Sequence, residues 1–327
     1  MTRSLVTGGA GFIGSHLVDA LLAAGHDVRV FDNFATGDRR NLLHVAADVD
    51  ILEGDLRSFE RAATAARGCD YVFHQAALPS VPRSIQDPLT TSAVNTTGTL
   101  NMLLAARDAG VKRFVYASSS SVYGTNPAET KDETLPVAPV SPYGVSKYAA
   151  EAYCQAFYRV YGLEAVALRY FNVFGPRQNP LSEYAAVIPN FLSAALLKEK
   201  ATVYGDGGQT RDFTFIENVV DGNMRAATAD GAAGETFNVA CGERYSILDL
   251  LAAVSEVTGT PVEPNHEDPR TGDIRTSLAN IDKARQVLGY SPSIGLTEGL
   301  RRTHEYFVSD DTLLSRIREH RQWVSAA

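Results

Sequence analysis

The chain has 327 residues, of which 45% are hydrophobic and 21% are charged, and its formal net charge is −8. This composition is typical of a globular protein of one large or two modest domains, and the negative charge argues against nucleic acid as the main partner. No signal peptide and no membrane span are expected, because glycines interrupt the N-terminal apolar run and no later run is long enough. Cys69, Cys154 and Cys241 are scattered without metal-ligand spacing, so we expect no metal site, no disulfide framework and a cytoplasmic location.

The first predicted element is a short buried strand over residues 4–6, followed by the sequence TGGAGFIG from Thr7 to Gly14. A helical apolar pattern over residues 15–24 comes directly after it. Glycines at positions 8, 11 and 14 suit a sharp strand-to-helix turn, a close backbone approach to a pyrophosphate and tight packing of helix on strand. The alternative is an ordinary tight turn, so the neighbouring elements decide between the two interpretations.

Residues 27–31 are predicted as a second strand that ends at Asp32, 18 positions after Gly14. A carboxylate about 20 residues after such a turn is placed to accept hydrogen bonds from the adenosine ribose. It would also repel a 2′-phosphate, which favours NAD over NADP. Without the glycine turn, a solvated aspartate at a strand end would be an equally good interpretation.

Strands and helices then alternate up to about residue 170. The predicted strands cover residues 49–53, 71–74, 112–116 and 165–169, and the predicted helices cover 57–66, 88–109 and 141–161. This alternation predicts an α/β fold, a Rossmann-like doubly wound parallel sheet with helices on both faces. We assign residues 1–171 to this cofactor-binding domain.

The pattern changes after residue 171. Residues 172–183 and 261–275 read as loops, and short strands at 201–204, 213–215 and 236–239 alternate with helices at 184–197, 217–229 and 246–258. Residues 172–327 are therefore predicted to form mainly a smaller mixed α/β substrate-binding domain, with some segments able to return to the first. It should cover the carboxyl ends of the strands, where ligands bind in open α/β sheets.

Tyr143 and Lys147 share one face of the predicted helix over residues 141–161. A tyrosine with a pKa of about 10 is a poor base, but a nearby ammonium and a cationic nicotinamide would lower that pKa. This pair alone is common on helix surfaces. Here it follows a strand that ends in the serines 118–121, one of which could bind the same substrate oxygen, although most of them could serve only the strand-to-loop transition.

These motifs together resemble the extended short-chain dehydrogenase/reductases. The shared features are the glycine turn, Asp32, Gly54-Asp55, HQAA at 74–77, the segment 119–124 and Tyr143-x-x-x-Lys147. The sequences RYFN ending at Asn172, RDF starting at Arg211 and Arg270-x-x-Asp273 resemble the nucleotide-sugar members. The pattern is most similar to NAD-dependent UDP-glucose and UDP-N-acetylglucosamine 4-epimerases.

The resemblance implies roles for individual residues. It implies that Ser119 is the catalytic serine, Tyr143 the base, and Lys147 the residue that binds the nicotinamide ribose. The implied NAD-binding residues are Gly8, Gly11, Phe12, Ile13, Gly14, Asp32, Asn33, Asp55, Leu56, Gln75, Ala76, Ala77, Tyr143, Lys147 and Tyr170. The implied substrate-binding residues are Ser80, Ser119, Ser120, Ser121, Tyr143, Asn172, Ala186, Val187, Tyr204, Arg211, Arg270, Asp273 and Ser277. Two arginines can neutralise a diphosphate with forked hydrogen bonds.

Two positions discriminate among members of the family. Dehydratases carry a Thr-Asp-Glu-like triplet and UDP-glucuronate decarboxylases a glutamate where this chain has Ser119-Ser120-Ser121, so no carboxylate assists elimination or decarboxylation. Spacing from Arg270 aligns Ser277 with the position where a tyrosine restricts other epimerases to glucose and galactose. A serine there leaves room for a 2-acetamido group.

The resulting expectation is an isomerase that interconverts UDP-N-acetylglucosamine with UDP-N-acetylgalactosamine and UDP-glucose with UDP-galactose. The alternatives are a UDP-glucuronate 4-epimerase, for which Arg83 and Arg177 are candidate carboxylate ligands, or another nucleotide-sugar oxidoreductase or dehydratase of the family. A non-catalytic nucleotide sensor on this fold would be expected to lose Tyr143 or Lys147. The resemblance also implies a homodimer formed through the helices at 88–109 and 141–161.

Overall fold

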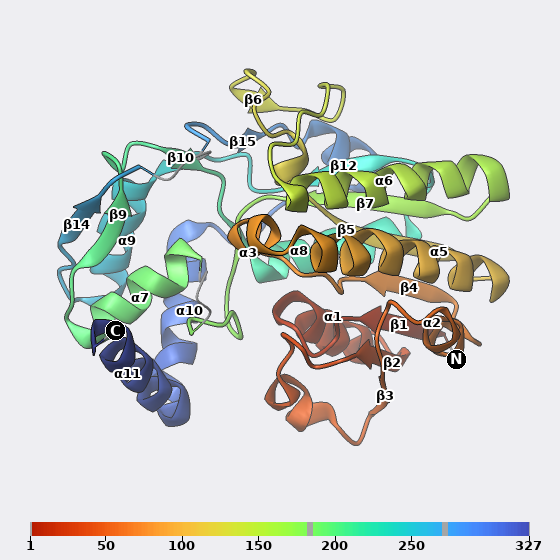
Figure 1. Cartoon of the computed structure of the whole chain (residues 1–327), viewed down its shortest axis with the longest axis horizontal. Helices are drawn as coiled ribbons and strands as arrows, with labels where there is room; N and C mark the ends of the chain where they lie inside the picture. The colour runs from red at the N-terminus through yellow and green to blue at the C-terminus, as the bar shows by residue number, and fades with distance from the viewer. Residues whose placement is uncertain (1, 182–185, 270–273, 327) are drawn as a thin grey trace.

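The structure, a computed structural model, describes residues 2–181, 186–269 and 274–326. The largest sheet within these residues has seven parallel strands in the order β12-β7-β5-β4-β1-β2-β3 (Figure 1). Its strands are β1 (Arg3–Thr7), β2 (Asp27–Asp32), β3 (Val49–Glu53), β4 (Tyr71–His74), β5 (Arg113–Ser119), β7 (Ala165–Tyr170) and β12 (Thr236–Val239). The predicted parallel sheet is therefore confirmed.

Successive side chains of the central strands pack on opposite faces of the sheet. Leu5 of β1 and Phe114 of β5 belong to one buried cluster, whereas their neighbours Val6 and Val115 belong to the other. Strand side chains alternate with a period of two, so a strand covered on both faces reads as a continuous apolar run. That is why these strands could be recognised from short runs such as SLV and YVF.

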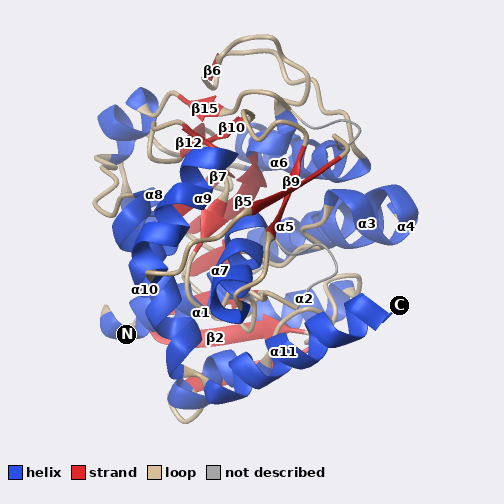
Figure 2. Cartoon of the chain, turned by 90° about the vertical axis from the view of Figure 1, so that its left-hand side faces the viewer, coloured by secondary structure: helices blue, strands red, loops and turns tan. Residues whose placement is uncertain are grey.

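Helices cover both faces of the sheet (Figures 1 and 2). One face is covered by α2 (Phe59–Ala66), α5 (Gly98–Asp108) and α6 (Pro142–Tyr161), and the other by α1 (Phe12–Ala23) and α8 (Ile216–Thr228). Ala62, Met102 and Cys154 contribute to the first core, and Leu17 and Val219 to the second. The fold is thus the doubly wound, Rossmann-like arrangement that the alternation predicted.

The strand order reverses between β1 and β4. The chain proceeds outward from β1 to β2 and β3, then returns to β4 on the other side of β1. In such sheets the carboxyl ends of the strands diverge at the reversal and leave a crevice for ligands. The glycine turn follows β1 and residues 75–77 follow β4, so both predicted cofactor segments border this crevice.

The remaining elements lie mostly to one side of the sheet, on the left in Figure 1. The longer helices are α7 (Val187–Leu197), α9 (Ile247–Thr258), α10 (Leu296–Ser309) and α11 (Asp311–Ala326). The strand pairs are β8 (Val173–Phe174) with β11 (Thr214–Phe215), β9 (Ala201–Tyr204) with β14 (Pro264–Glu267), β10 (Thr210–Arg211) with β13 (Tyr245–Ser246), and β6 (Thr130–Lys131) with β15 (Leu278–Ala279). The short helical turns are η1 (Arg39–Val45), α3 (Val81–Gln86), α4 (Pro88–Ser92), η2 (Ala93–Thr97), η3 (Ser120–Val122) and η4 (Ala284–Leu288).

Two predicted segments differ from the structure. The helix predicted over 88–109 is interrupted by the π turn η2, where the Asn95 side chain bonds both the N–H and the C=O of Leu78. The loop predicted over 261–275 contains β14, whose sequence PNHE is fully exposed and therefore lacks an apolar period. The strand predicted at 236–239 is β12 at the edge of the main sheet, so this segment after residue 171 returns to the first sheet, as the predicted domain division allowed.

The edge strand β12 is held by hydrogen bonds between Asn238 and segments distant in the sequence. The Asn238 backbone N–H donates to Glu133 Oε1 at 2.7 Å, and its side-chain amide donates to the C=O groups of Lys131 and Asn280. Asn238 itself is fully buried. Among the described residues, no helix combines the length and apolar character needed to cross a membrane.

Candidate active site

The turn after β1 accepts only glycine at two of the predicted positions. Gly8 has φ +67°, and a Cβ there would lie 2.8 Å from the backbone of Ala76. A Cβ at Gly14 would lie 2.1 Å from the carbonyl oxygen of Gly8. Gly11 is the N-cap of α1 and provides no capping side chain, so the first-turn N–H groups remain available to an anion. Phe12 and Ile13, both half-buried, begin the helix.

Asp32 joins the end of β2 to this turn. Its Oδ2 accepts a hydrogen bond from Ala10 N at 2.9 Å, and its Oδ1 accepts one from Phe34 N at 2.8 Å. Burial raises the pKa of Asp32, while these backbone N–H groups act in the opposite direction. Each carboxylate oxygen can accept more than one hydrogen bond, so ribose hydroxyls can still bind here.

The other predicted adenosine-side residues lie beside Asp32. Asn33 Nδ2 donates to Asp55 Oδ2 at 3.1 Å. The Arg57 guanidinium lowers the pKa of Asp55 to about 2. Leu56, the next residue, is buried. The ends of β2 and β3 thus present two acidic groups and an apolar wall, a set that fits an adenosine carrying a free 2′-hydroxyl.

The segment after β4 connects to Tyr170 through an asparagine that the sequence did not reveal. The Tyr170 hydroxyl lies 3.2 Å from Gln75 Oε1 and 3.0 Å from Asn223 Oδ1, and Gln75 Nε2 donates to the same Asn223 oxygen. Ala76 and Ala77 follow and are half-buried. Asn223 is in the middle of α8, and no local motif marks it.

Tyr143 and Lys147 project from the first turns of α6 toward the end of β5. Ser141 caps this helix by accepting a hydrogen bond from Gly144 N, and Pro142 occupies its first position. The Lys147 Nζ donates to the Ala117 carbonyl at 2.8 Å and lies 6.0 Å from the centroid of the Tyr143 ring. The two side chains of the predicted pair therefore lie on one face of the helix and close to each other, near the end of β5.

Burial changes the acidity of both groups. It raises the pKa of Tyr143, while a hydrogen bond with the Ser119 side chain lowers it. Burial lowers the pKa of Lys147 to about 7. A phenol in this position needs additional positive charge to ionise near neutral pH, and the Lys147 ammonium together with a cationic nicotinamide would supply it.

At the serine triplet the chain leaves β5 and enters the short helical turn η3. Ser119 Oγ lies 3.1 Å from Ser121 Oγ and accepts a hydrogen bond from Ser121 N. Ser120 is half-buried at the start of η3. Of the three serines, Ser119 is the one whose side chain bonds Tyr143, and the other two follow it directly in the chain.

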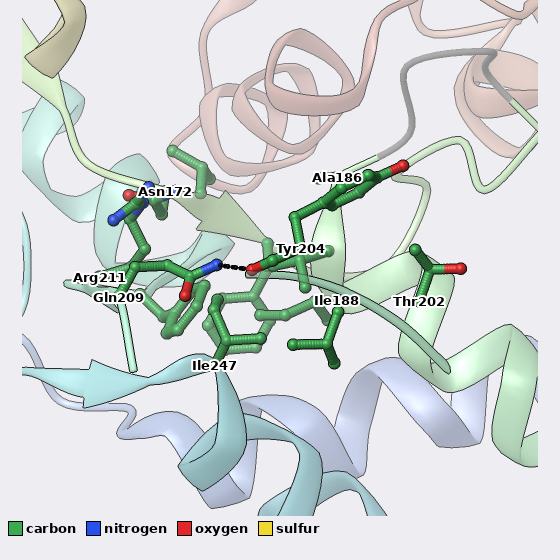
Figure 3. A pocket seen from close by; sticks show the side chains of 13 residues that line it. Asn172, Ala186, Ile188, Thr202, Tyr204, Gln209, Arg211 and Ile247 are labelled. Atoms are coloured by element: carbon green, nitrogen blue, oxygen red, sulfur yellow. Dashed lines mark hydrogen bonds between the residues drawn. The ribbon is translucent and has the colours of Figure 1, made fainter. Parts of the chain in front are cut away.

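A cavity of about 250 Å³ lies between α7, β9 and β10 (Figure 3). Five predicted substrate residues line it: Asn172, Ala186, Val187, Tyr204 and Arg211. Thr202, Gln209, Phe213 and Ile247 also line it and were not predicted; Gln209 Nε2 donates to the Tyr204 carbonyl at 2.9 Å, the dashed line in Figure 3. Arg211 Nη1 donates to the Ile274 carbonyl at 2.7 Å, which directs a guanidinium into the cavity wall. Asn172 has φ +25°, a strained backbone of the kind found at functional sites.

The other predicted substrate residues lie at two further places or outside the described residues. Ser80 caps α3, and Ser84 of that helix accepts a hydrogen bond from Tyr143 N at 3.1 Å, so α3 adjoins the start of α6. Ser277 N donates to the Thr210 carbonyl at 3.1 Å, next to Arg211. Arg270 and Asp273 lie outside the described residues.

The two arginines considered as ligands for a uronate carboxylate occupy different positions. Arg177 Nη2 pairs with Asp19 Oδ2 of α1 at 2.7 Å and lies 3.4 Å from His44 Nε2. Arg83 is an exposed residue of α3. Arg177 is thus already engaged by a carboxylate of the protein.

Comparison with known proteins gives a consistent set of similarities. The model of the family described as "NAD dependent epimerase/dehydratase family" matches residues 4–240. A UDP-glucose 4-epimerase from Mycolicibacterium smegmatis is 41% identical over 314 residues, covering 93% of this chain and 98% of that protein. The structure of a UDP-N-acetylglucosamine 4-epimerase from Methanobrevibacter ruminantium in complex with UDP-N-acetylmuramic acid is similar with a TM-score of 0.90, at 39% identity over 94% of this chain and 98% of that one. A UDP-glucose 4-epimerase from Thermus thermophilus in complex with NAD has a TM-score of 0.86 at 39% identity, covering 94% and 99%.

Proposed function

The chain belongs to the NAD-dependent epimerase/dehydratase family, and from this membership we propose that it is an NAD-dependent 4-epimerase of UDP-hexoses. The proposed substrates are UDP-N-acetylglucosamine with UDP-N-acetylgalactosamine and UDP-glucose with UDP-galactose. The observation that carries the proposal is the cluster of Tyr143, Ser119 and Lys147 beside a serine triplet without a carboxylate. Such a set can move a proton at a sugar hydroxyl but has no acid for elimination.

NAD is the cofactor, and the residues around the glycine turn fit it. The close approach at Gly8 and Gly14 leaves no room for a side chain, and the open N-terminus of α1 suits a pyrophosphate. Asp32 and Asp55 would hold the adenosine, and Tyr170 with Gln75 the nicotinamide side. Bound NAD would supply the reversible hydride transfer at the sugar C4, so the redox chemistry would belong to the cofactor.

The protein's own residues handle the proton and the orientation of the sugar. Tyr143 would remove the proton from the O4 hydroxyl and later return it, with Ser119 bonded to the same oxygen. The Lys147 ammonium would stabilise the phenolate, because a positive charge nearby lowers a phenol pKa. No net proton or electron is consumed, as an epimerisation requires.

The cavity at Asn172 and Arg211 would anchor the nucleotide half of the substrate. Arg211, together with Arg270, would neutralise the diphosphate, and Ala186, Val187, Tyr204 and Asp273 would contact the nucleoside. An anchored nucleotide allows the 4-keto sugar to rotate about its diphosphate link and present its opposite face. The alternative substrate, UDP-glucuronate, gains no support from Arg177, which is paired with Asp19.

The test is a separate incubation with each UDP-sugar followed by chromatographic resolution of the products. We expect UDP-N-acetylglucosamine and UDP-glucose each to yield the C4 epimer without consumption of a reductant. UDP-glucuronate serves as the comparison substrate and should react more slowly. A 4-keto-6-deoxy sugar or a UDP-pentose as the main product would contradict the proposal.

Ser277→Tyr is expected to select against the 2-acetamido substrate. Ser277 lies beside Arg211, and a tyrosine there would occupy the space that an N-acetyl group needs. We expect kcat/KM for UDP-N-acetylglucosamine to fall about tenfold to hundredfold, since such pocket contacts are worth about 1–3 kcal/mol. The value for UDP-glucose should change little. Ser277→Ala, which leaves the pocket open, is the matched control, and equal losses for both substrates in S277Y would contradict the assignment.

We further propose a homodimer that forms through α4, α5 and α6. Val145, Tyr148, Ala152 and Ala156 make one exposed stripe along α6, and Leu89 of α4 is 83% exposed. Exposed apolar stripes of this kind mark protein–protein contacts.

Introducing a charge into this stripe should separate the subunits. Ala152→Arg is expected to convert the dimer to a monomer in sedimentation velocity, because an unpaired guanidinium at a buried interface is costly. Val308→Arg, which places the same charge on exposed α10, should leave the mass unchanged. A monomeric wild-type protein at micromolar concentration would contradict the proposed assembly.

The division into residues 1–171 and 172–327 is also a proposal, in which residues 172–327 form most of the nucleotide-sugar side. A cytoplasmic location is proposed from the cysteine content, since all three cysteines are free thiols.

A further inference from the structure

Three side chains of α6 contact three consecutive residues at the end of β5. Tyr143 bonds the Ser119 side chain, and Lys147 donates to the Ala117 carbonyl. One turn further along, the Ser118 hydroxyl donates to Glu151 Oε2 at 2.6 Å. Residues four apart lie on one helix face. Glu151 is therefore the next side chain after the two proposed catalytic residues on that face.

Glu151 is bound by an arginine from the neighbouring strand. Arg169 Nη2 lies 2.6 Å from Glu151 Oε1, and Arg169 Nε lies 3.1 Å from Oε2. The Glu151 side chain is 1% exposed and that of Arg169 is 5% exposed. Arg169 is the register partner of Ser118, so the carboxylate bridges β5 and β7 as well as binding both to α6. The guanidinium also stacks on Tyr123, 4.7 Å from the ring centroid.

This pairing has a consequence for Lys147. A lysine and a glutamate four residues apart on a helix attract one another, and the attraction is stronger in a buried, low-dielectric site. Yet among the described residues, no carboxylate lies within ion-pair distance of the Lys147 Nζ. Glu151 is occupied on both oxygens by Arg169 and on one also by Ser118.

We propose that Arg169 is a positioning residue that holds Glu151 away from Lys147, so that the ammonium charge remains directed at Tyr143. The inference rests on the proposed function, because it concerns the base of that reaction. Without Arg169, the Glu151 carboxylate would turn to the nearest cation on its own helix face. The Glu151 carboxylate would then neutralise the Lys147 ammonium, which would stabilise the Tyr143 phenolate less.

The surroundings leave few competing charges. The titratable groups that contact or electrostatically affect the Lys147 ammonium are Tyr143 and Cys154 of α6, Tyr116 of β5 and His74 of β4. The Glu151–Arg169 pair lies one helical turn further along α6. Burial lowers the pKa of His74 to about 3 and raises the pKa of the Cys154 thiol and of the Tyr116 phenol. At neutral pH these three groups are uncharged, whereas Lys147, with a pKa of about 7, is partly protonated. The carboxylate that could pair with its ammonium is that of Glu151, which is bound by Arg169.

The test compares Arg169→Gln with the double variant R169Q/E151Q. In R169Q the freed carboxylate should shift the acidic limb of the kcat–pH profile upward by about one pH unit. A shift of that size lowers kcat about tenfold at any pH below the limb, with KM for the UDP-sugar nearly unchanged. In R169Q/E151Q the carboxylate is gone, so the limb should return to its wild-type position even if the double variant is less stable.

A matched arginine at the opposite end of the same strands is the control. Arg113 of β5 pairs with Glu164, which precedes β7, at 2.8 Å, and its side chain is 10% exposed. Arg113→Gln removes an ion pair between the same two strands but leaves the Glu151 region intact. Its pH profile should match that of the wild type, which separates a local electrostatic effect from a general weakening of the sheet.

A second measurement does not depend on turnover. Ultraviolet difference titration of tyrosinate, with Tyr143→Phe as the blank, reports the ionisation of Tyr143 directly. It should move upward in R169Q and return in R169Q/E151Q. If R169Q does not fold, Arg169→Lys replaces it; a single ammonium holds the carboxylate less firmly, so a smaller shift in the same direction is expected.

The possible outcomes separate the proposed role of Arg169 from the proposed epimerase activity. An unshifted limb and an unshifted tyrosinate titration in R169Q, or in R169K where R169Q does not fold, would overturn the role of Arg169, as would a shift that persists in R169Q/E151Q. An inactive wild-type protein would instead contradict the epimerase proposal, while the tyrosinate titration would still decide the question of Arg169.

Discussion

Replacing Tyr143 with phenylalanine is expected to lower kcat for epimerisation about 10³-fold, since general acid–base groups typically contribute 10²–10⁴-fold. The phenol oxygen is the only atom removed, and it is the atom proposed to carry the O4 proton. The ring remains, so the packing of this buried residue between α6 and the end of β5 should survive. Initial rates with UDP-N-acetylglucosamine and thermal unfolding measure the two effects separately.

A second tyrosine on the same helix provides the control for this variant. Tyr148 is 39% exposed and belongs to the exposed stripe of α6, on a different face of the helix from Tyr143. Tyr148→Phe removes the same hydroxyl group five residues further along α6 and should retain the wild-type kcat. Near-normal turnover by Y143F, or an equal loss in both variants, would show that Tyr143 is not the base.

Gly14→Ala is expected to weaken the binding of NAD. The added Cβ would lie 2.1 Å from the Gly8 carbonyl oxygen, a separation that no pair of non-bonded atoms tolerates. The turn or α1 must move, and the segment proposed to hold the pyrophosphate moves with it. We expect a loss of about 1–3 kcal/mol in the free energy of unfolding, the usual cost of overpacking. A similar loss in binding energy corresponds to about tenfold to hundredfold weaker NAD binding.

Denaturant unfolding and the NAD content of the purified protein measure these effects. Gly295→Ala is the matched control, because a Cβ at Gly295 would meet no atom within 4 Å and the residue has φ −80°. Because Gly295 is the N-cap of α10 and alanine is a poorer N-cap than glycine, G295A should cost about 1 kcal/mol or less in stability and leave the NAD content unchanged. Full NAD content in G14A would show that the turn is not the cofactor site.

Much of the fold was predictable because local patterns were sufficient for it. The strands at 49–53 and 71–74 were predicted with the bounds that the structure has. The apolar run at 71–73 is typical of a strand covered on both faces, whereas β3 is a partly exposed strand at the edge of the sheet. Local apolar patterns did not predict the elements that form through contacts with segments distant in the sequence. Strand β14 exists through pairing with β9, and its own sequence carries no signal.

The candidate site likewise contains residues that could be predicted from the sequence and residues that could not. The glycine turn, Asp32 and the Tyr143–Lys147 pair follow short spacings that a sequence displays. Asn223 and Glu151 do not, because each looks like an ordinary polar helix residue until its partner is known. The buried carboxylate of Glu151 is compensated by an ion pair with Arg169, which is 18 residues later in the chain, on β7. Networks of this kind depend on the fold and cannot be predicted from local spacing.

The position of β12 has a consequence for how the protein is made. When the first 171 residues have emerged from the ribosome, β7 is the outer strand of the sheet, and its free edge can pair with any exposed strand. The chain must grow to residue 239 before β12 covers that edge. Until then the nascent chain is vulnerable to aggregation. A truncation near residue 171 would make that temporary risk permanent.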